Sequence, residues 1–156
     1  MKYKQLTKEQ FEELHEEFSL FLATQKIDVS KWKDIKRNNS KMADEELNIF
    51  SDLVWEKVLG KANYLEHFSK DSINLFKCDE NNMQRIVVKT SRKDFDFLNK
   101  GNFNWFLDNS KDESLDYFKG QKTYSKERNA EIFELIEQSA IVSDGVLFEA
   151  IFKIIG

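Results

Sequence analysis

The sequence predicts an α+β fold in which N-terminal helices are followed by a small antiparallel sheet and then by C-terminal helices. Two observations support this prediction. Apolar residues recur at helical spacing over residues 7–62 and again after residue 125, whereas residues 72–118 contain short segments with the alternation and β-branched content of strands. Helices and strands that are grouped along the chain are typical of α+β folds.

The clearest predicted helix begins at Thr7, which forms a capping-box pattern with Gln10. Its apolar stripe consists of Phe11, Leu14, Phe18, Phe21 and Leu22. A second, short helix is expected after Asp28 or Ser30. A third helix over residues 42–62 has a broad apolar face and is therefore expected to be central to the core.

The strand-like region begins with SINLFKC and MQRIVVKT, which we expect to pair as a hairpin around residues 79–82. DFDFL (94–98) alternates as a third strand would, and LDYF (115–118) is expected to be an edge strand. A short helix is predicted between them. Ser125 and Ser143 are expected to begin the two C-terminal helices.

The length of 156 residues fits a single domain. We divide it into a helical part (1–68), a small sheet with a short helix (72–118) and C-terminal helices (125–155). The composition, 40% hydrophobic and 33% charged, is that of a globular protein.

Several functional classes lack sequence support. Cys78 is the only cysteine, so an internal disulfide and a cysteine-rich zinc site are excluded. The five glycines are scattered, and neither a phosphate-binding loop nor a dinucleotide fingerprint occurs. No secretion signal or apolar stretch of ~20 residues is found, which favours a cytoplasmic location. We expect no cofactor.

Three longer segments resemble a family of uncharacterised small bacterial proteins. They are LTKEQFEELHEEFSLFLATQ, EELNIFSDLVWEKVLGKANYLEHFS and FELIEQSAIVSDG, and the similarity covers nearly the whole chain. The family has no assigned activity, cofactor or catalytic residue. The resemblance therefore implies a stand-alone bacterial domain and identifies no site.

Glu12 and His15 have the Glu-x-x-His spacing that helical bundles use to bind metals. The second such motif that a di-metal bundle needs is missing, because no glutamate lies three residues before His67. His15 also follows the core-facing Leu14. The pattern favours a solvated helix face, with a metal site as the alternative.

His67, in NYLEHF, is expected to end a helix, where the helix dipole favours a cation. Glu66 and Tyr64 lie beside it in sequence. If these three side chains lined a pocket they would offer general acid–base groups, so a small enzyme is the first alternative function. A structural helix end is the favoured interpretation.

A basic segment with one aromatic residue covers positions 30–37. Its lysine and arginine side chains surround a tryptophan ring, and such a ring would stack on an unpaired base. An RNA-associated factor is therefore the second alternative function. The residues concerned are Lys31, Trp32, Lys33, Lys36 and Arg37. The formal charge of the chain is −4, however, and nucleic-acid-binding domains are usually basic.

Phe103, Trp105 and Phe106 are too close in sequence to point in one direction. We expect at least one of them at the surface, where aromatic residues are good anchors for a partner. The sequence therefore predicts a non-enzymatic protein that binds another protein, as an accessory subunit, an adaptor or an immunity-type inhibitor. The sequence predicts no oligomeric state.

Overall fold

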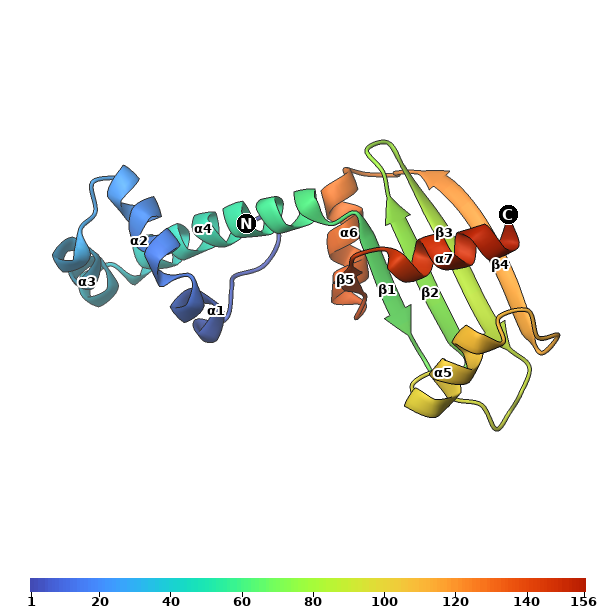
Figure 1. Cartoon of the computed structure of the whole chain (residues 1–156). Coiled ribbons are helices and arrows are strands. Elements are labelled where there is room, and N and C mark those ends of the chain that lie inside the picture. Colours follow the sequence, from blue (N-terminus) through green and yellow to red (C-terminus); the bar gives the residue numbers. More distant parts are fainter. The chain divides into compact units, whose positions relative to one another are not determined.

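The computed structural model describes residues 1–156. It contains seven helices and one five-stranded antiparallel sheet, which confirms the predicted α+β class (Figure 1). Contacts within the chain group it into two units, Met1–Val58 and Leu59–Gly156. Each unit is described separately below.

The first unit is helical. Its elements are α1 (Lys8–Glu13), α2 (His15–Thr24), α3 (Val29–Asn38) and α4 (Ser40–Lys61), whose last residues belong to the second unit. Both predicted caps are confirmed: Thr7 and Gln10 form a capping box, and the Asp28 carboxylate accepts a hydrogen bond from the backbone N–H of Lys31. Ser30 lies inside α3 instead.

One predicted helix is two helices in the structure, because the backbone departs from helical geometry at Leu14 (φ −103°, ψ 24°). Nδ1 of His15 lies 3.0 Å from the carbonyl oxygen of Glu12. In an uninterrupted helix that oxygen would accept the backbone N–H of Glu16. The imidazole thus binds the carbonyl at the end of α1 and marks the break.

The first unit has its own apolar core, in which aromatic rings pack between the helices. Its buried and half-buried members are Phe18, Phe21, Leu22, Ile27, Trp32, Ile35, Met42 and Ala43. The α4 helix contributes Phe50, which contacts the rings of Phe18 and Phe21. Ile49 and Leu53 of α4 are about half exposed, so the buried face of this helix is narrower than the sequence indicates.

The second unit contains the sheet, whose strand order is β4-β3-β2-β1-β5. The strands are β1 (Tyr64–Phe68), β2 (Ser72–Cys78), β3 (Asn82–Thr90), β4 (Leu115–Thr123) and β5 (Ile141–Ser143), and all neighbours are antiparallel. The β2–β3 hairpin and the edge position of β4 confirm the sequence prediction. Residues 64–68 were expected to end a helix, but they pair with both β2 and β5.

Other expectations for this unit are wrong in detail. Residues 94–98 form turns, and their alternation reflects the insertion of Phe95 and Phe97 into the core. Ser143 ends β5, and the last helix, α7 (Val146–Ile155), begins after Gly145. The α6 helix (Arg128–Glu137) begins after Glu127 rather than at Ser125. The predicted short helix is confirmed as α5 (Lys100–Asp108).

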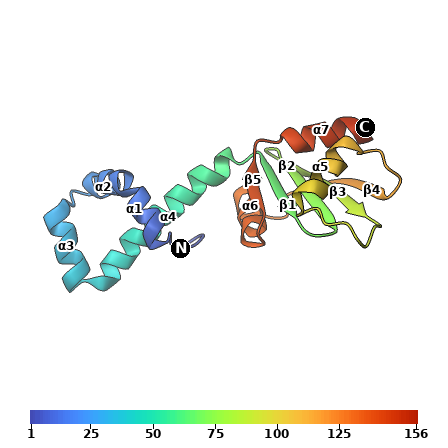
Figure 2. The same cartoon turned by 60° about the horizontal axis from the view of Figure 1, so that its bottom comes forward.

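Two helices cover one face of the sheet, and a third covers part of the other. Figures 1 and 2 show α5 and α7 on the first face, where the main core forms. Its fully buried members include Ile73, Leu75, Ile86, Val88 and Phe106. The α6 helix lies on the opposite face.

The turn into α7 requires a glycine for two reasons. Gly145 has a φ of +82°, which side-chain-bearing residues rarely adopt. A Cβ atom at this position would also lie 2.4 Å from ring carbons of Tyr64, well inside van der Waals contact. The hydroxyl of Tyr64 in turn donates to the Glu149 carboxylate of α7 at 2.9 Å.

Arg128, at the start of α6, joins three elements of the second unit. Its guanidinium donates to the carbonyl oxygens of Leu59 and Ala62, at the end of α4, at 2.9 and 2.6 Å. It also donates to the carbonyl oxygens of Cys78 and Asp79, where β2 ends. The Leu59 oxygen also accepts the backbone N–H of Ala62, and the Asp79 oxygen also accepts the hydroxyl of Tyr124. The guanidinium adds a charged donor to each of the four carbonyls and so ties the end of α4 to the end of β2.

Replacing Arg128 by methionine should lower the free energy of unfolding of the second unit by about 3 kcal/mol, because buried carbonyls lose charged donors. Urea denaturation followed by circular dichroism measures this change. Lys93→Met is the control: Lys93 is exposed, and its loss should change the free energy of unfolding by about 0.5 kcal/mol or less. Equal effects of the two variants would contradict the structural role given to Arg128.

Candidate functional site

A groove lies between α6 and the sheet face that α5 and α7 leave free. Its wider part has a volume of about 410 Å³ and is bordered by β3, β4 and α6. The apolar floor is made by Phe76, Met83 and Leu135, and charged and polar side chains form the rim. An apolar floor with a few polar groups is typical of binding sites.

A second hollow of about 230 Å³ continues the groove towards β1, where it reaches His67 and Asn74. The two hollows share Phe76, Arg85, Leu135 and Gln138, so they form one elongated depression along α6. We call it the α6 groove.

Gly120 of β4 explains part of the width of this groove. It pairs with Arg85 of β3, and both positions lie on the sheet face beneath the groove. A Cβ atom on Gly120 would meet nothing within 4 Å. The missing side chain therefore leaves open space, and no special backbone conformation requires the glycine.

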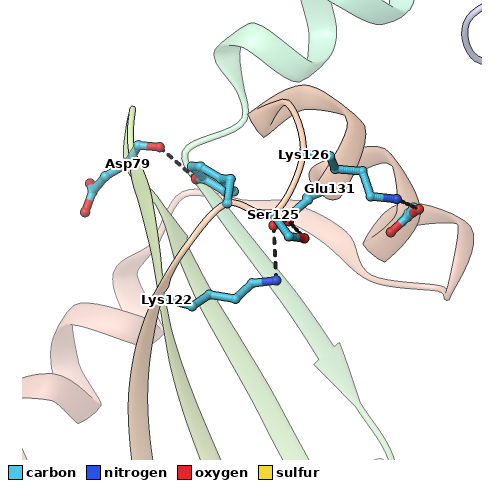
Figure 3. A network of polar contacts seen from close by, with 7 residues as sticks. Asp79, Lys122, Ser125, Lys126 and Glu131 are labelled. Carbon is cyan, nitrogen blue, oxygen red and sulfur yellow. Dashed lines mark hydrogen bonds and ion pairs between the residues drawn. The ribbon is translucent and has the colours of Figure 1, made fainter.

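Glu131 of α6 lies in the wall of the groove with only 6% of its surface exposed. Its Oε1 atom accepts hydrogen bonds from the backbone N–H and the hydroxyl of Ser125, each at 2.6 Å. The ammonium group of Lys122 on β4 lies 3.2 Å from Oε2. Figure 3 shows these groups converging where β4 leads into α6.

Burial on its own would raise the pKa of Glu131, because it disfavours the charged carboxylate. The two hydrogen bonds from Ser125 and the ammonium group of Lys122 outweigh burial and lower this pKa to about 2. Glu131 is therefore a carboxylate at neutral pH. Its Oε2 atom accepts no hydrogen bond of good geometry, although the ion pair with Lys122 is close.

Arg85 stands between the two hollows. Its Nε and Nη2 atoms donate to the side-chain oxygen of Asn74 at 3.2 and 2.5 Å, and its guanidinium lies over the ring of Phe76. These contacts fix the plane of the group. The residue is exposed, and no hydrogen bond within the chain uses its Nη1 atom, so this donor is available.

Another hollow, of about 500 Å³, lies near the end of α4 and is lined by polar residues. Its cations already have partners: Arg128 binds main-chain carbonyls, and Lys77 pairs with Glu149 at 3.0 Å. The α6 groove, with its apolar floor and the unused Nη1 donor of Arg85, is the better candidate site.

The structure brings together only part of the group proposed for an enzyme: Glu66 and His67 border one hollow of about 260 Å³, and Tyr64 does not line it. Adjacent residues of a strand point to opposite faces. Tyr64 and Glu66 belong to the face covered by α7, whereas His67 lies on the α6 side and lines the groove. Burial raises the pKa of Glu66, with a smaller opposing effect from a hydrogen bond with Ser143.

The Glu12–His15 pair has a structural explanation, since the His15 ring binds the Glu12 carbonyl oxygen rather than its carboxylate. No three histidine, cysteine or acidic side chains of residues 1–156 are arranged to hold a metal ion. In this fold, the Glu-x-x-His spacing places the His15 imidazole beside a carbonyl oxygen at the end of α1.

The basic segment lies on α3 in the first unit. Trp32 is half-buried there, with the edge of Phe18 against its ring and the Lys36 ammonium over it at 5.8 Å. Lys31, Lys33 and Arg37 are exposed. Stacking on a base would require the ring to give up these contacts.

The aromatic residues of α5 are divided between core and rim. Phe106 is completely buried, so no partner reaches it in this fold. Phe103 packs against Phe68, and Trp105 packs against Phe95; both are half-buried.

Sequence reasoning missed the residues that shape the groove. Glu131 and Arg85 look like ordinary charged residues of a helix and a strand, and only the crossing of α6 over the sheet brings them together. Gly120, a glycine inside a strand, was the available signal, because such a position often marks close approach or open space.

A model of a family of unknown function, DUF6495, matches residues 1–156. The chain belongs to this family. The resemblance seen in the sequence to an uncharacterised family is thus confirmed over the whole chain. Comparison of this DUF6495 chain with curated proteins and with solved structures gave no match. None of its helices is both long enough and apolar enough to cross a membrane.

Replacing Glu131 by glutamine tests its electrostatic environment. A carboxyl group whose pKa is about 2 in the fold and 4.5 in the unfolded chain stabilises the fold above pH 4.5. The free energy of unfolding of wild type should be about 2–3 kcal/mol higher than that of Glu131→Gln at pH 7. This difference should shrink as the pH falls from 4.5 towards 2.

Urea titrations at several pH values measure the difference. Glu134→Gln, at an exposed position one turn along α6, is the control and should change the free energy of unfolding by less than about 1 kcal/mol. A Glu131→Gln effect that does not vary with pH would show that the carboxylate is not specifically stabilised.

Proposed function

We propose that this protein acts by binding another protein and that the α6 groove holds an extended segment of the partner. The proposal includes the non-enzymatic role and the cytoplasmic location expected from the sequence. An accessory subunit, an adaptor and an immunity-type inhibitor would each use such a surface.

The observation that carries the proposal is the shape of the groove together with its lining. It is elongated, open to solvent and apolar along its floor, as a site for an extended chain should be. Apart from Arg85, which lies between the two hollows, the charged groups lie in the walls and rim, as in many protein interfaces.

The groove also offers hydrogen bonds that an extended chain can complete. Nη1 of Arg85 can donate to a partner's carbonyl or carboxylate oxygen. The Lys122 ammonium, which lies at the rim beside the buried Glu131 carboxylate, adds a second cationic group for such an oxygen. Arg85 and Lys122 both line the wider hollow, together with the apolar residues of its floor. A buried side chain of the partner on Phe76 and Leu135 would supply most of the binding energy.

The other surfaces considered in the sequence are weaker candidates. Phe103 and Trp105 are largely occupied by core contacts, and Trp32 is packed within the first unit. Glu66 and His67 border one small hollow, but they lie on opposite faces of β1 and Tyr64 does not join them. By contrast, the α6 groove is open space that no other element of the chain fills.

Two substitutions in the groove should abolish binding of the partner. Arg85→Glu reverses a charge at its centre, and Leu135→Lys places a cation on its floor. Lys93→Glu is the matched control, because it reverses an exposed charge outside the groove. Each tagged variant is used to capture proteins from cells that naturally contain the chain, and mass spectrometry compares them with wild type.

We expect a protein that wild type and Lys93→Glu retain and that both groove variants lose by tenfold or more. Circular dichroism confirms that each variant is folded. A partner retained equally by all four proteins would refute the groove as the binding site. A small molecule that copurifies in place of any protein would favour an enzyme.

A further inference from the structure

The two edges of the sheet differ in length and in exposure. β5 has three residues, whereas β4 has nine and forms the outermost strand at the other edge (Figure 1). Every residue of β4 beyond Tyr117 is exposed. A long exposed edge is a template for pairing with another strand.

The backbone of this edge has unused hydrogen-bonding groups. Residues 116–123 pair with β3 on one side, and no other hydrogen bond reaches their main chain. Alternate N–H and C=O groups of an antiparallel strand point away from its neighbour. The outward-pointing groups of β4 are therefore available to a strand of another molecule.

We infer that β4 pairs with β4 of a second copy of this chain, antiparallel and centred on Lys119, so that two sheets become one. This inference goes beyond the proposed function and does not depend on it. A two-fold axis perpendicular to the sheet relates the two strands, and each residue then lies opposite one at equal distance from Lys119.

The sequence of β4 is self-complementary in this register. On the face that carries α6, Asp116 lies opposite Lys122 of the second copy, and the reverse pair repeats the contact. Phe118, which is 53% exposed, lies opposite Gly120, whose position has open space above it. Opposite charges and an aromatic ring over a strand glycine both stabilise cross-strand pairs.

On the other face, Tyr117 lies opposite Gln121, and Lys119 lies opposite its own copy. The repulsion between the two lysines is limited, because the Lys119 ammonium is directed towards α7. It donates to the main-chain oxygen of Gly156 at 2.8 Å and lies 5.4 Å from the centre of the Phe152 ring.

The neighbouring registers lose this complementarity. In a symmetric antiparallel pair, residues that lie opposite each other have side chains on the same face. The two-fold axis therefore passes beside one residue, and the alternative registers are centred on its neighbours. Centred on Phe118, the strands place Asp116 opposite Gly120. Centred on Gly120, they place Lys122 opposite Phe118. Only the register centred on Lys119 matches every charged residue of the α6-side face with an opposite charge.

Charge reversal tests the pairing. Analytical ultracentrifugation of wild type should show a dimer, and Asp116→Lys should raise its dissociation constant about tenfold or more. The triple variant Asp116→Lys/Lys122→Glu/Glu131→Gln exchanges the two charges without placing two carboxylates together, and it should restore the dimer relative to Asp116→Lys/Glu131→Gln. Circular dichroism checks that the variants fold, since Lys122 also pairs with Glu131.

A cysteine at the centre tests the register independently. In Lys119→Cys the two thiols face each other with Cα atoms ~4.5–5.5 Å apart, within the range for a disulfide. Oxidation should therefore link most of the protein into dimers on a non-reducing gel. In the control, Tyr117→Cys, the two thiols lie four residues apart along the strands, ~13 Å, and should not be linked.

The native cysteine does not interfere, because Cys78 is buried and burial raises the pKa of its thiol to about 11. Wild type that is monomeric at 100 μM, a dimer that Asp116→Lys leaves intact, or equal linking of the two cysteine variants would each overturn the inference. If the groove variants lose the captured partner, the inference that β4 pairs with a second copy is unaffected.

Discussion

The second unit depends on one guanidinium group. Arg128 collects the carbonyl oxygens at the end of α4 and at the end of β2, and its own helix begins at the same point. Because one guanidinium donates to carbonyl oxygens of both chain endings, it fixes where α6 starts relative to the sheet. The direction of α6 across the strands follows from that fixed start.

The position of α6 has a consequence for the free face of the sheet. The helix is too short to cover all five strands, so a depression remains beside it, and Glu131 and Arg85 project into that depression. The same strand that borders the depression, β4, is also the open edge of the sheet. The chain thus leaves part of one sheet face uncovered and one sheet edge unpaired, and both are surfaces that another molecule can contact.

The sequence was informative where local rules decide the structure. The Thr7 capping box and the β2–β3 hairpin follow from short-range patterns, and both are confirmed. It was misleading where tertiary contacts decide: residues 64–68 continue a helical pattern but join the sheet between two strands. The candidate site could not be predicted at all, because its residues come from β2, β3, β4 and α6 and acquire meaning only when these elements cross.

Gly145 and Tyr64 have a consequence for how members of the family can diverge. The ring occupies the volume that a side chain at position 145 would need. Any descendant that gains a side chain there must first lose the ring, and with it the bond to Glu149. Loss of the ring removes only one of the two obstacles, because the positive φ of Gly145 still disfavours a side chain there. The two positions therefore constrain each other's history although they lie far apart in the sequence.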